Sequence, residues 1–340
     1  MKLLLLSLAA LGLSAAAPAQ DATQNQVANP DQSPVPAQVP EAEAAAPVPA
    51  PAAPFVIEET GKGFYRLDDA VRAANGGDAT ILIAPGTYHD CAVVEHGRVA
   101  FRARTSGSAI FDGGICEGKA ALVLRGQDAM VDGLVFQNMR VQEGNGAGIR
   151  IEHGDLTVMN ATFRNSEEGI LSADDPTGTI RVDRSTFSGL GRCDRGLSCA
   201  HSLYVGHYGR LFVTRSRFER GRGGHYLKTR SARVSITDNS FDDSQGHATN
   251  YIVDLCAGST GLVARNIMVQ GPDKENHSGF IVVAAEERTN PSAGLTITGN
   301  TASLAPGATY PTVFVIDFSH EPLKISANTV GKGITAFDMR

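Results

Sequence analysis

The chain has 340 residues, of which 42% are hydrophobic, and its 30 Lys and Arg residues nearly balance its 36 Asp and Glu residues. This balance is unremarkable, and the sequence has no nucleic-acid-binding motif, so no nucleic-acid partner is predicted. No stretch reaches the ~18 consecutive apolar residues that a membrane-spanning helix needs, so no membrane span is expected.

The first residues have the pattern of a secretory signal peptide. Lys2 precedes an apolar run at residues 3–13, and the small residues Ala17 and Ala19 then offer an A-x-A cleavage site. We therefore predict a signal peptide over residues 1–19 and a secreted or periplasmic location for the mature protein.

A linker and one folded domain are expected to follow the signal peptide. Residues 20–54 lack order-promoting side chains and become rich in Ala and Pro, which predicts a disordered, semi-rigid linker. Residues 55–340 are long for one compact core but ordinary for one solenoid. Near the start of this domain, the apolar residues of "LDDAVRAA" at 67–74 have the i, i+3, i+4, i+7 spacing of a helix, which we expect to cap the open end of the solenoid.

The domain repeats a unit of 23 to 34 residues, which is the period of a solenoid. Each unit begins with a branched aliphatic residue, and these lead positions are Val131, Val158, Val182, Val213, Ile236, Val263, Ile297 and Ile325. A large apolar residue follows the first six lead positions by five residues, giving Phe136, Phe163, Phe187, Phe218, Phe241 and Met268. Stacked coils would place this second set in one interior column.

A column of asparagines is predicted at a corner of the coils. Asn239, Asn266, Asn300 and Asn328 follow the last four lead positions by three residues. Asn side chains can satisfy backbone groups at such a corner and tolerate left-handed dihedral angles. Short β-rich runs such as "HYLKTRS" and "NYIVDLC" recur once per period. Each coil is therefore expected to have at least two strands, and equivalent strands are expected to stack in parallel.

Over residues 62–340 the chain resembles the right-handed parallel β-helix proteins, often called pectin-lyase-like. The resemblance rests on "LDDAVRAANGGDATILIAPGTY", on "AIFDGG" at 109–114 and on the repeated aliphatic-x-x-Asn-x-Phe unit. It implies an all-β fold, a right-handed parallel β-helix solenoid with an N-terminal capping helix. It leaves the function open, because this architecture carries lyases, hydrolases, epimerases, adhesins and inert scaffolds.

Positive charge is concentrated in residues 181–233, where twelve basic residues stand against three acidic ones. One interpretation is a cleft for a polyanion, which for a secreted chain would be an acidic polysaccharide. The alternative is a solvated belt whose charge is balanced by acids on neighbouring coils, such as Asp238, Asp242 and Asp243.

Lys228 is the candidate catalytic base. If the strand at 225–231 stacks on the strand at 251–257, Lys228 and Asp254 lie one coil apart, with side chains about 5 Å from each other. A shift of one residue in register would turn either side chain to the opposite face. A structural ion pair between coils is the alternative interpretation of the same two residues.

The segment "YLKTRSARVSITDNSF" is similar to the Lys-bearing coil of β-helix lyases that act on alginate and on chondroitin-type chains. The resemblance implies that Lys228 is the base and that an Arg is the acid. The next coil, where such enzymes present the Arg, offers Asp254 instead, and Arg230 could substitute if it faces the same groove. The predicted catalytic residues are Lys228, Arg230, Asp254 and His225.

Four histidines fall on or beside three consecutive coils, with two tyrosines near the same strands, and these histidines are His201, His207, His225 and His247. Together with the basic residues they could line one wall of a groove. The predicted substrate-binding residues are Tyr204, His201, His207, Arg217, Arg222, Tyr226, Asn276 and Glu286.

The cysteines predict disulfides rather than a metal site. Cys193 and Cys199 have two histidines after them, in the spacing Cys-x5-Cys-x-His-x5-His, but this spacing matches no common zinc motif and a bridge is preferred. Cys91 and Cys116 are expected to bridge adjacent turns, which leaves Cys256 buried in a strand. No metal or cofactor is predicted, and a calcium requirement is left open.

Two functions of different class are consistent with these features. The first is a polysaccharide lyase or epimerase, in which a base removes the proton α to a uronate carboxylate and cations stabilise the dianionic intermediate. The second is a non-catalytic glycan-binding or envelope scaffold protein. A hydrolase that uses Asp254 and Glu286 is a weaker third hypothesis. In the first two cases we expect a monomer whose partner is an acidic polysaccharide.

Overall fold

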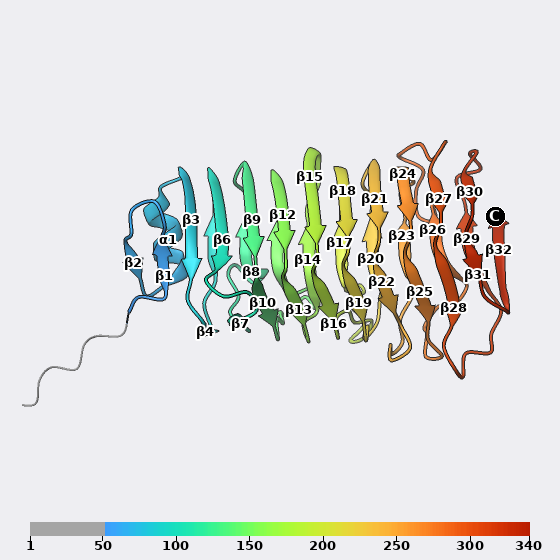
Figure 1. Ribbon diagram of the computed structural model, residues 1–340, viewed down its shortest axis with the longest axis horizontal. Coiled ribbons are helices and arrows are strands. Elements are labelled where there is room, and N and C mark those ends of the chain that lie inside the picture. Colours follow the sequence, from blue (N-terminus) through green and yellow to red (C-terminus); the bar gives the residue numbers. More distant parts are fainter. Residues whose placement is uncertain (1–51) are drawn as a thin grey trace, which may run out of the picture. The chain divides into compact units, whose positions relative to one another are not determined.

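The structure is a computed structural model that describes residues 52–340. The predicted signal peptide, and the predicted linker except for its last three residues, lie outside the described residues. From Phe55 onward the chain coils through three long sheets, and successive coils stack along one axis (Figure 1). Each coil contributes one strand to each sheet, and all pairings are parallel except those that join β1 to β2 and to β3. The chain is therefore a parallel β-helix.

Sheet A has twelve strands. In spatial order they are β2 (Gly63–Phe64), β1 (Phe55–Ile57), β3 (Asp78–Ile83), β6 (Arg98–Ala103), β9 (Asp128–Asp132), β12 (Asp155–Met159), β15 (Asp175–Asp183), β18 (Tyr208–Thr214), β21 (Arg233–Thr237), β24 (Thr260–Ala264), β27 (Thr296–Thr298) and β30 (Lys324–Ser326). The eight lead positions of the repeat all lie in this sheet, and consecutive ones pair in register.

Sheets B and C have ten strands each. Sheet B consists of β4 (Gly86–Tyr88), β7 (Ala109–Asp112), β10 (Leu134–Gln137), β13 (Thr162–Arg164), β16 (Thr186–Ser188), β19 (Arg217–Glu219), β22 (Ser240–Asp242), β25 (Ile267–Gln270), β28 (Thr301–Leu304) and β31 (Thr329–Val330). Sheet C consists of β5 (Ala92–Val94), β8 (Ala120–Leu124), β11 (Ala147–Ile151), β14 (Glu168–Ser172), β17 (Leu203–Val205), β20 (Leu227–Thr229), β23 (Val253–Leu255), β26 (Gly279–Val283), β29 (Thr312–Asp317) and β32 (Ile334–Met339).

The predicted helix is α1 (Leu67–Ala74), at the N-terminal end of the solenoid (Figure 1). It buries Leu67, Ala70 and Val71, and it packs against β1, β2, β3 and β5. The amphipathic spacing therefore has the expected consequence, since the apolar side of the helix covers the first coils. No helix in residues 52–340 is long and apolar enough to cross a membrane.

A stack of aromatic rings fills the interior behind sheet B. The predicted column is confirmed from Phe136 to Met268, and all six of its side chains are fully buried. Phe111 extends it by one coil, and neighbouring rings from Phe111 to Phe241 lie with centroids 4.6 to 5.6 Å apart. The regular offset between lead position and ring reflects one packing constraint that is repeated on each coil.

An asparagine ladder marks the corner between sheets A and B. Asn239 donates its side-chain N–H to Asn266 Oδ1 at 2.9 Å, and Asn266 donates in the same way to Asn300 at 2.9 Å. Each side-chain oxygen also accepts a backbone N–H from the coil before it. The left-handed dihedral angles belong to the preceding residues, such as Asp238 with φ 62° and Arg265 with φ 55°. The asparagines therefore satisfy the corner through hydrogen bonds and do not themselves form the left-handed turn.

Candidate functional site

One outward row of side chains on sheet C brings predicted catalytic residues together. The strand register pairs Tyr204 with Lys228 and Lys228 with Asp254. The expected register is confirmed, and Lys228 Nζ lies 4.0 Å from Asp254 Oδ2. From the N-terminal end the row consists of Val93, Val123, Arg150, Leu171, Tyr204, Lys228, Asp254, Val282, Ile316 and Asp338.

Two acidic side chains from the loop after β26 hold the cations of this row. The backbone N–H groups of Glu286 and Glu287 both bond to the carbonyl oxygen of Cys256 at 3.0 Å, so the loop folds back toward β20. The Glu286 carboxylate accepts hydrogen bonds from Lys228 and Arg230. Glu287 accepts a hydrogen bond from Arg230 Nε at 2.8 Å. Arg230 therefore faces the same groove as Lys228.

Tyr204 lies beneath both cations. The Lys228 ammonium and the Arg230 guanidinium lie 5.6 and 5.5 Å from the centroid of its ring, within the range of cation–π attraction. Its hydroxyl accepts a hydrogen bond from Arg230, which leaves the hydroxyl proton free to be donated. His207 joins the edge of the cluster, with Nε2 3.3 Å from Glu287.

His201 and His225 form the neighbouring wall, with their rings stacked at 4.9 Å. His225 Nδ1 accepts the N–H of Tyr251 at 3.2 Å, and His201 Nδ1 accepts the N–H of His225 at 2.9 Å. A ring nitrogen that accepts carries no proton, so each neutral ring holds its proton on Nε2. Burial lowers the pKa of both histidines well below the usual value, so both are neutral. His225 Nε2 lies 3.5 Å from Asp254 Oδ2.

The electrostatics of the row differ between its acid and its base. Burial raises the pKa of Asp254 to about 7, although the Lys228 ammonium opposes the rise, and Asp254 Oδ1 has no hydrogen-bond partner among the described residues. Burial also lowers the pKa of Lys228, but the hydrogen bond to Glu286 and the charge of Asp254 outweigh it. The pKa of Lys228 therefore lies above its usual value, and its amine is an ammonium ion in this arrangement.

Asp254, Cys256 and Glu286 place three potential metal-ligating atoms within 4.8 Å of one another. The set suits calcium poorly, because calcium takes about six to eight oxygen ligands. Burial raises the pKa of the Cys256 thiol to about 12, so it stays protonated. Lys228 and Arg230 already neutralise Glu286. The carboxylates of the cluster therefore pair with two protein cations, Lys228 and Arg230.

Other predicted substrate-binding residues lie away from this row. Tyr226 is 1% exposed, and its hydroxyl donates to Asp243 in the interior at 2.7 Å. The backbone N–H groups of the consecutive residues Tyr226 and Leu227 both bond to the following coil, so the backbone bends here before β20 begins. The alternation of side chains that would turn Tyr226 outward starts only after this bend. Arg217 belongs to sheet B and pairs with Glu219 at 2.5 Å.

Two further predicted residues and His247 belong to the turns between sheets B and C. Asn276 accepts the N–H of Ser278 at 3.1 Å, and His247 pairs with Asp273. Arg222 lies in the turn between β19 and β20, where it donates to Asn165 Oδ1 at 3.3 Å. The structure thus brings together Tyr204, His201, His207, His225, Lys228, Arg230, Asp254 and Glu286 and separates the remaining predicted residues from them.

The basic belt is largely paired and does not form one cleft. Seven of its twelve cations have a carboxylate within 4.0 Å, and these are Arg184, Arg192, Arg195, Arg215, Arg217, Lys228 and Arg230. The belt spreads over all three sheets, because successive residues of a coil pass around the solenoid. Most of the basic residues in 181–233 therefore fit the alternative interpretation, in which nearby acids balance their charge.

Sequence reasoning missed Glu287, although the adjacent acids of "VAAEERTN" directly after a strand were a visible signal. It also missed the hollow that continues the row toward the N-terminal end. A cavity of about 300 Å³ there is lined by Lys119, Glu143, Asn145, Arg150 and Leu171 among others. Leu171 pairs with Tyr204, so the hollow lies next to the Lys228 cluster on the same face.

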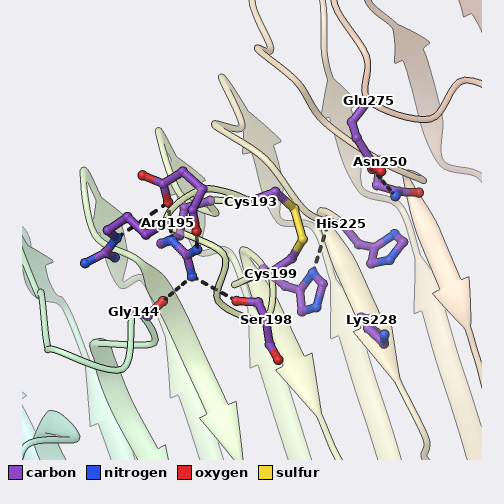
Figure 2. Close-up of a disulfide and its surroundings, with 12 residues drawn as sticks. Gly144, Cys193, Arg195, Ser198, Cys199, His225, Lys228, Asn250 and Glu275 are labelled. Atoms are coloured by element: carbon purple, nitrogen blue, oxygen red, sulfur yellow. Dashed lines mark hydrogen bonds and ion pairs between the residues drawn. A yellow bond between two sulfur atoms is a disulfide. The ribbon is translucent and has the colours of Figure 1, made fainter.

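Both predicted disulfides are present, Cys91–Cys116 and Cys193–Cys199, and Cys256 is free and buried. Figure 2 shows the loop closed by Cys193 and Cys199 beside His225 and Lys228. A Cβ atom on Gly224 would lie 2.1 Å from the Ala200 carbonyl oxygen, so the turn before β20 closely approaches the residue that follows this loop. The disulfide therefore holds a wall of the groove.

Comparison of the sequence with protein families agrees with the parallel β-helix fold. The model of the right handed beta helix region family matches residues 120–307, and the chain belongs to this family. No match is found among curated proteins.

Three solved structures are similar at low identity. One is a variant of the PL6 family alginate lyase AlyGC, at 17% identity and a TM-score of 0.47, with 78% of this chain and 38% of that chain covered. The chain therefore spans less than half of that lyase. The surface protein and adhesin PfbA of Streptococcus pneumoniae is similar at 10% identity and a TM-score of 0.38, with 80% and 94% covered. A pectin methylesterase in complex with a hexasaccharide is similar at 12% identity and a TM-score of 0.32, with 78% of each chain covered.

Proposed function

We propose that this chain binds an acidic polysaccharide along the outer face of sheet C and cleaves it by β-elimination, or epimerises it, at Lys228. The observation that carries the proposal is the capture of one carboxylate, that of Glu286, by both Lys228 and Arg230. The Glu286 side chain is 39% exposed, so it can be displaced. A uronate carboxylate has the same charge and planar shape and suits the guanidinium fork of Arg230.

This exchange would make Lys228 a better base. Burial favours the neutral amine, and the hydrogen bond that Lys228 donates to Glu286 is the largest influence against it. When Arg230 takes the substrate carboxylate and Glu286 moves away, burial is opposed mainly by Asp254, and the pKa of Lys228 falls. Below about pH 7 Asp254 is protonated as well, which removes its attraction for the ammonium ion.

The proposed reaction balances as follows. Lys228 Nζ takes the proton from the carbon α to the carboxylate, and the electron pair moves onto the carboxylate to give a dianion that Arg230 stabilises. The electron pair then forms a double bond as the bond between the β carbon and the glycosidic oxygen breaks. The leaving oxygen takes its proton from the Tyr204 hydroxyl. Without bond cleavage, a water molecule gives a proton to the opposite face of the carbon to form the epimer, and the hydroxide that remains takes the proton from Lys228.

The direct test is incubation with polymers of mannuronate, guluronate, galacturonate and glucuronate, with the unsaturated product detected by ultraviolet absorbance and mass spectrometry. Glu286→Gln should tighten binding of the accepted polymer, because it removes the internal competitor for Arg230. Glu275→Gln is the matched control, since Glu275 is exposed and bonds to Asn250 outside the cluster. Equal affinities in the two variants would contradict carboxylate exchange.

A non-catalytic glycan-binding protein is the second candidate function. The raised pKa of Lys228 favours it, because an ammonium ion binds an anion but does not remove a proton. Polymer binding without product would support this function. Such binding should weaken steeply with salt, as the screening length falls from about 10 Å at 0.1 M to about 3 Å at 1 M.

We also propose that the protein works outside the cytoplasm. Two disulfides suit an oxidising compartment and agree with the signal peptide predicted from the sequence. Export in an expressing cell, followed by N-terminal sequencing of the mature chain, tests this proposal. A mature chain that begins at Gln20 is the expected result.

A further inference from the structure

A second cleft lies along the turns that join sheet B to sheet C. Its volume is about 440 Å³, and five successive turns contribute residues to it. The charged residues that matter are four arginines and two acids, namely Arg140, Arg192, Arg195, Arg222, Glu167 and Asp194. The cleft is thus rich in guanidinium groups and separate from the Lys228 row.

Two of the four arginines are neutralised and build the wall of the cleft. Arg192 pairs with Asp194 and donates to the carbonyl oxygens of Gly144 and Ser198 at 3.2 and 2.8 Å (Figure 2). Arg195 pairs with the buried Glu167 at 2.6 Å. A Cβ atom on Gly144 would lie 2.6 Å from Arg192 Nη1, so glycine at this position makes room for the arginines.

The other two arginines have no carboxylate partner. Arg140 donates to the backbone oxygen of Asn165 at 3.2 Å, and Arg222 donates to the side-chain oxygen of the same residue at 3.3 Å. Within residues 52–340 neither guanidinium has an acid within 4.0 Å, and both side chains are exposed. Two guanidinium groups at the cleft are therefore held by hydrogen bonds to one neutral residue, Asn165. Most of their N–H groups remain available to a ligand.

The backbone supports this arrangement. Gly189 has φ 66°, and a Cβ atom there would lie 2.9 Å from Asn165 Oδ1 and 3.7 Å from Arg222 Nε. The absence of a side chain lets Asn165 and Arg222 approach each other. Asn165 itself has φ 53°, which asparagine tolerates better than most residues. The backbone conformation of the coil thus favours the contact between Asn165 and Arg222.

We propose that the cleft between Arg140 and Arg222 binds a carboxylate or sulfate group of an acidic saccharide, at a subsite distinct from the Lys228 row. An oxyanion would relieve the repulsion between the two guanidinium groups and accept their parallel N–H groups. No Phe, Tyr or Trp lines the cleft, so its lining lacks the large aromatic side chains on which the bases of a single-stranded nucleic acid typically stack. The choice of a saccharide rests on the proposed function, whereas the anion site itself does not.

The test is isothermal titration calorimetry with inorganic sulfate and with a uronate hexasaccharide as probes. The double variant Arg140→Gln/Arg222→Gln should weaken binding of both probes about tenfold or more, since two charge-assisted contacts are lost. The matched control is Arg217→Gln/Arg220→Gln, which removes two arginines of similar position in the chain from sheet B and its following turn. It should change either affinity less than about twofold. Arg222→Lys, which keeps the charge but loses the fork, should lie between wild type and the double variant.

The outcomes separate this proposal from the proposed function. Lys324→Met should leave sulfate affinity unchanged, because Lys324 lies on sheet A and lines neither the cleft nor the Lys228 row. Arginine-dependent sulfate and hexasaccharide binding in a protein that forms no product supports the cleft and contradicts the catalytic function. Unchanged affinities for both probes in the arginine double variant would overturn the proposal that the cleft binds an anion. Tighter binding of a single-stranded oligonucleotide than of the hexasaccharide, lost in the double variant, overturns the saccharide assignment.

Discussion

The interior row behind sheet B and the outward row of sheet C run along the same coils but differ in how their residues change from coil to coil. The interior row has Phe at six consecutive positions, from Phe111 to Phe241, with each ring against the next. The outward row has apolar residues near both ends, such as Val123 and Ile316, and changes to Tyr204, Lys228 and Asp254 between them.

The difference follows from what each position must contact. An interior position meets the same neighbours on each coil, so one residue type satisfies the packing throughout. An outward position is covered only by turns and loops, whose lengths vary, and it can depart from the repeat at little cost to the fold. In this protein the changes of residue type in the outward row coincide with a buried lysine, a buried acid and two neutral histidines. The positions that repeat therefore support the fold, and the positions that differ carry the candidate chemistry.

The largest expected effect is on activity at the outward row. Lys228→Met should lower kcat by at least about a hundredfold, because it removes the base. Lys228→Arg should show the same loss while it keeps polymer affinity, since a guanidinium holds its proton. Steady-state kinetics on the accepted polymer measure both. Lys324→Met on sheet A is the control and should keep activity, and full activity in Lys228→Arg would exclude the base role.

The interior row should respond in stability. Phe187→Ala or Phe218→Ala should lower the free energy of unfolding by about 3 to 5 kcal/mol, because each leaves a cavity between two rings. Denaturant titration measures the loss. Phe212→Ala is the matched control, since Phe212 faces outward on sheet A beside Arg181, and it should cost about 1 kcal/mol or less. Similar losses of unfolding free energy at all three sites would show that the interior stack contributes no more to stability than an outward-facing ring.

The buried acid of the outward row should make stability depend on pH. The pKa of Asp254 in the folded protein is about 7, above its usual value of 3.8. The folded state therefore binds more protons than the unfolded state between these values, and wild-type stability falls as pH rises through this window. Asp254→Asn removes this titration. It should match wild type near about pH 4 and exceed it by about 4 kcal/mol near about pH 8.

Asp238→Asn is the control with the opposite sign. Arg265 holds the pKa of Asp238 below its usual value, so the wild-type carboxylate contributes stability above that value and loses it as pH falls. The cost of Asp238→Asn should therefore shrink toward low pH. Parallel pH profiles for the two variants would contradict the different environments of the two acids.

The smallest effect concerns the asparagine ladder. Asn266→Ala should lower the free energy of unfolding by about 1 to 3 kcal/mol, because it leaves the buried N–H of Asn239 without its acceptor and removes one of the two donors to Asn300 Oδ1. Asn328→Ala, at the partly exposed end of the ladder, should cost less, because water can replace its side chain there. Thermal unfolding of the two variants compares them directly, and a larger loss at Asn328 would argue against cooperation along the ladder.

The sequence by itself determined the stacking of the coils. The fixed offsets to Phe136 through Met268 and to Asn239 through Asn328 identified two columns, and both exist. The same periodicity placed Lys228 one coil from Asp254 in the correct register. These features could be predicted because stacking in a solenoid converts a repeated spacing along the chain into a contact in space.

Only the tertiary structure decided which side chains meet around Lys228. Glu286 reaches Lys228 across 58 residues because a loop folds back over β23, and no spacing in the sequence encodes that path. Tyr226 turns inward because a bend in the backbone precedes its strand. The basic residues of 181–233 are distributed over three sheets, and most of them form ion pairs with nearby carboxylates. Periodic spacing specifies which coils are neighbours, whereas loop paths and side-chain directions depend on packing between coils, which a one-dimensional pattern does not contain.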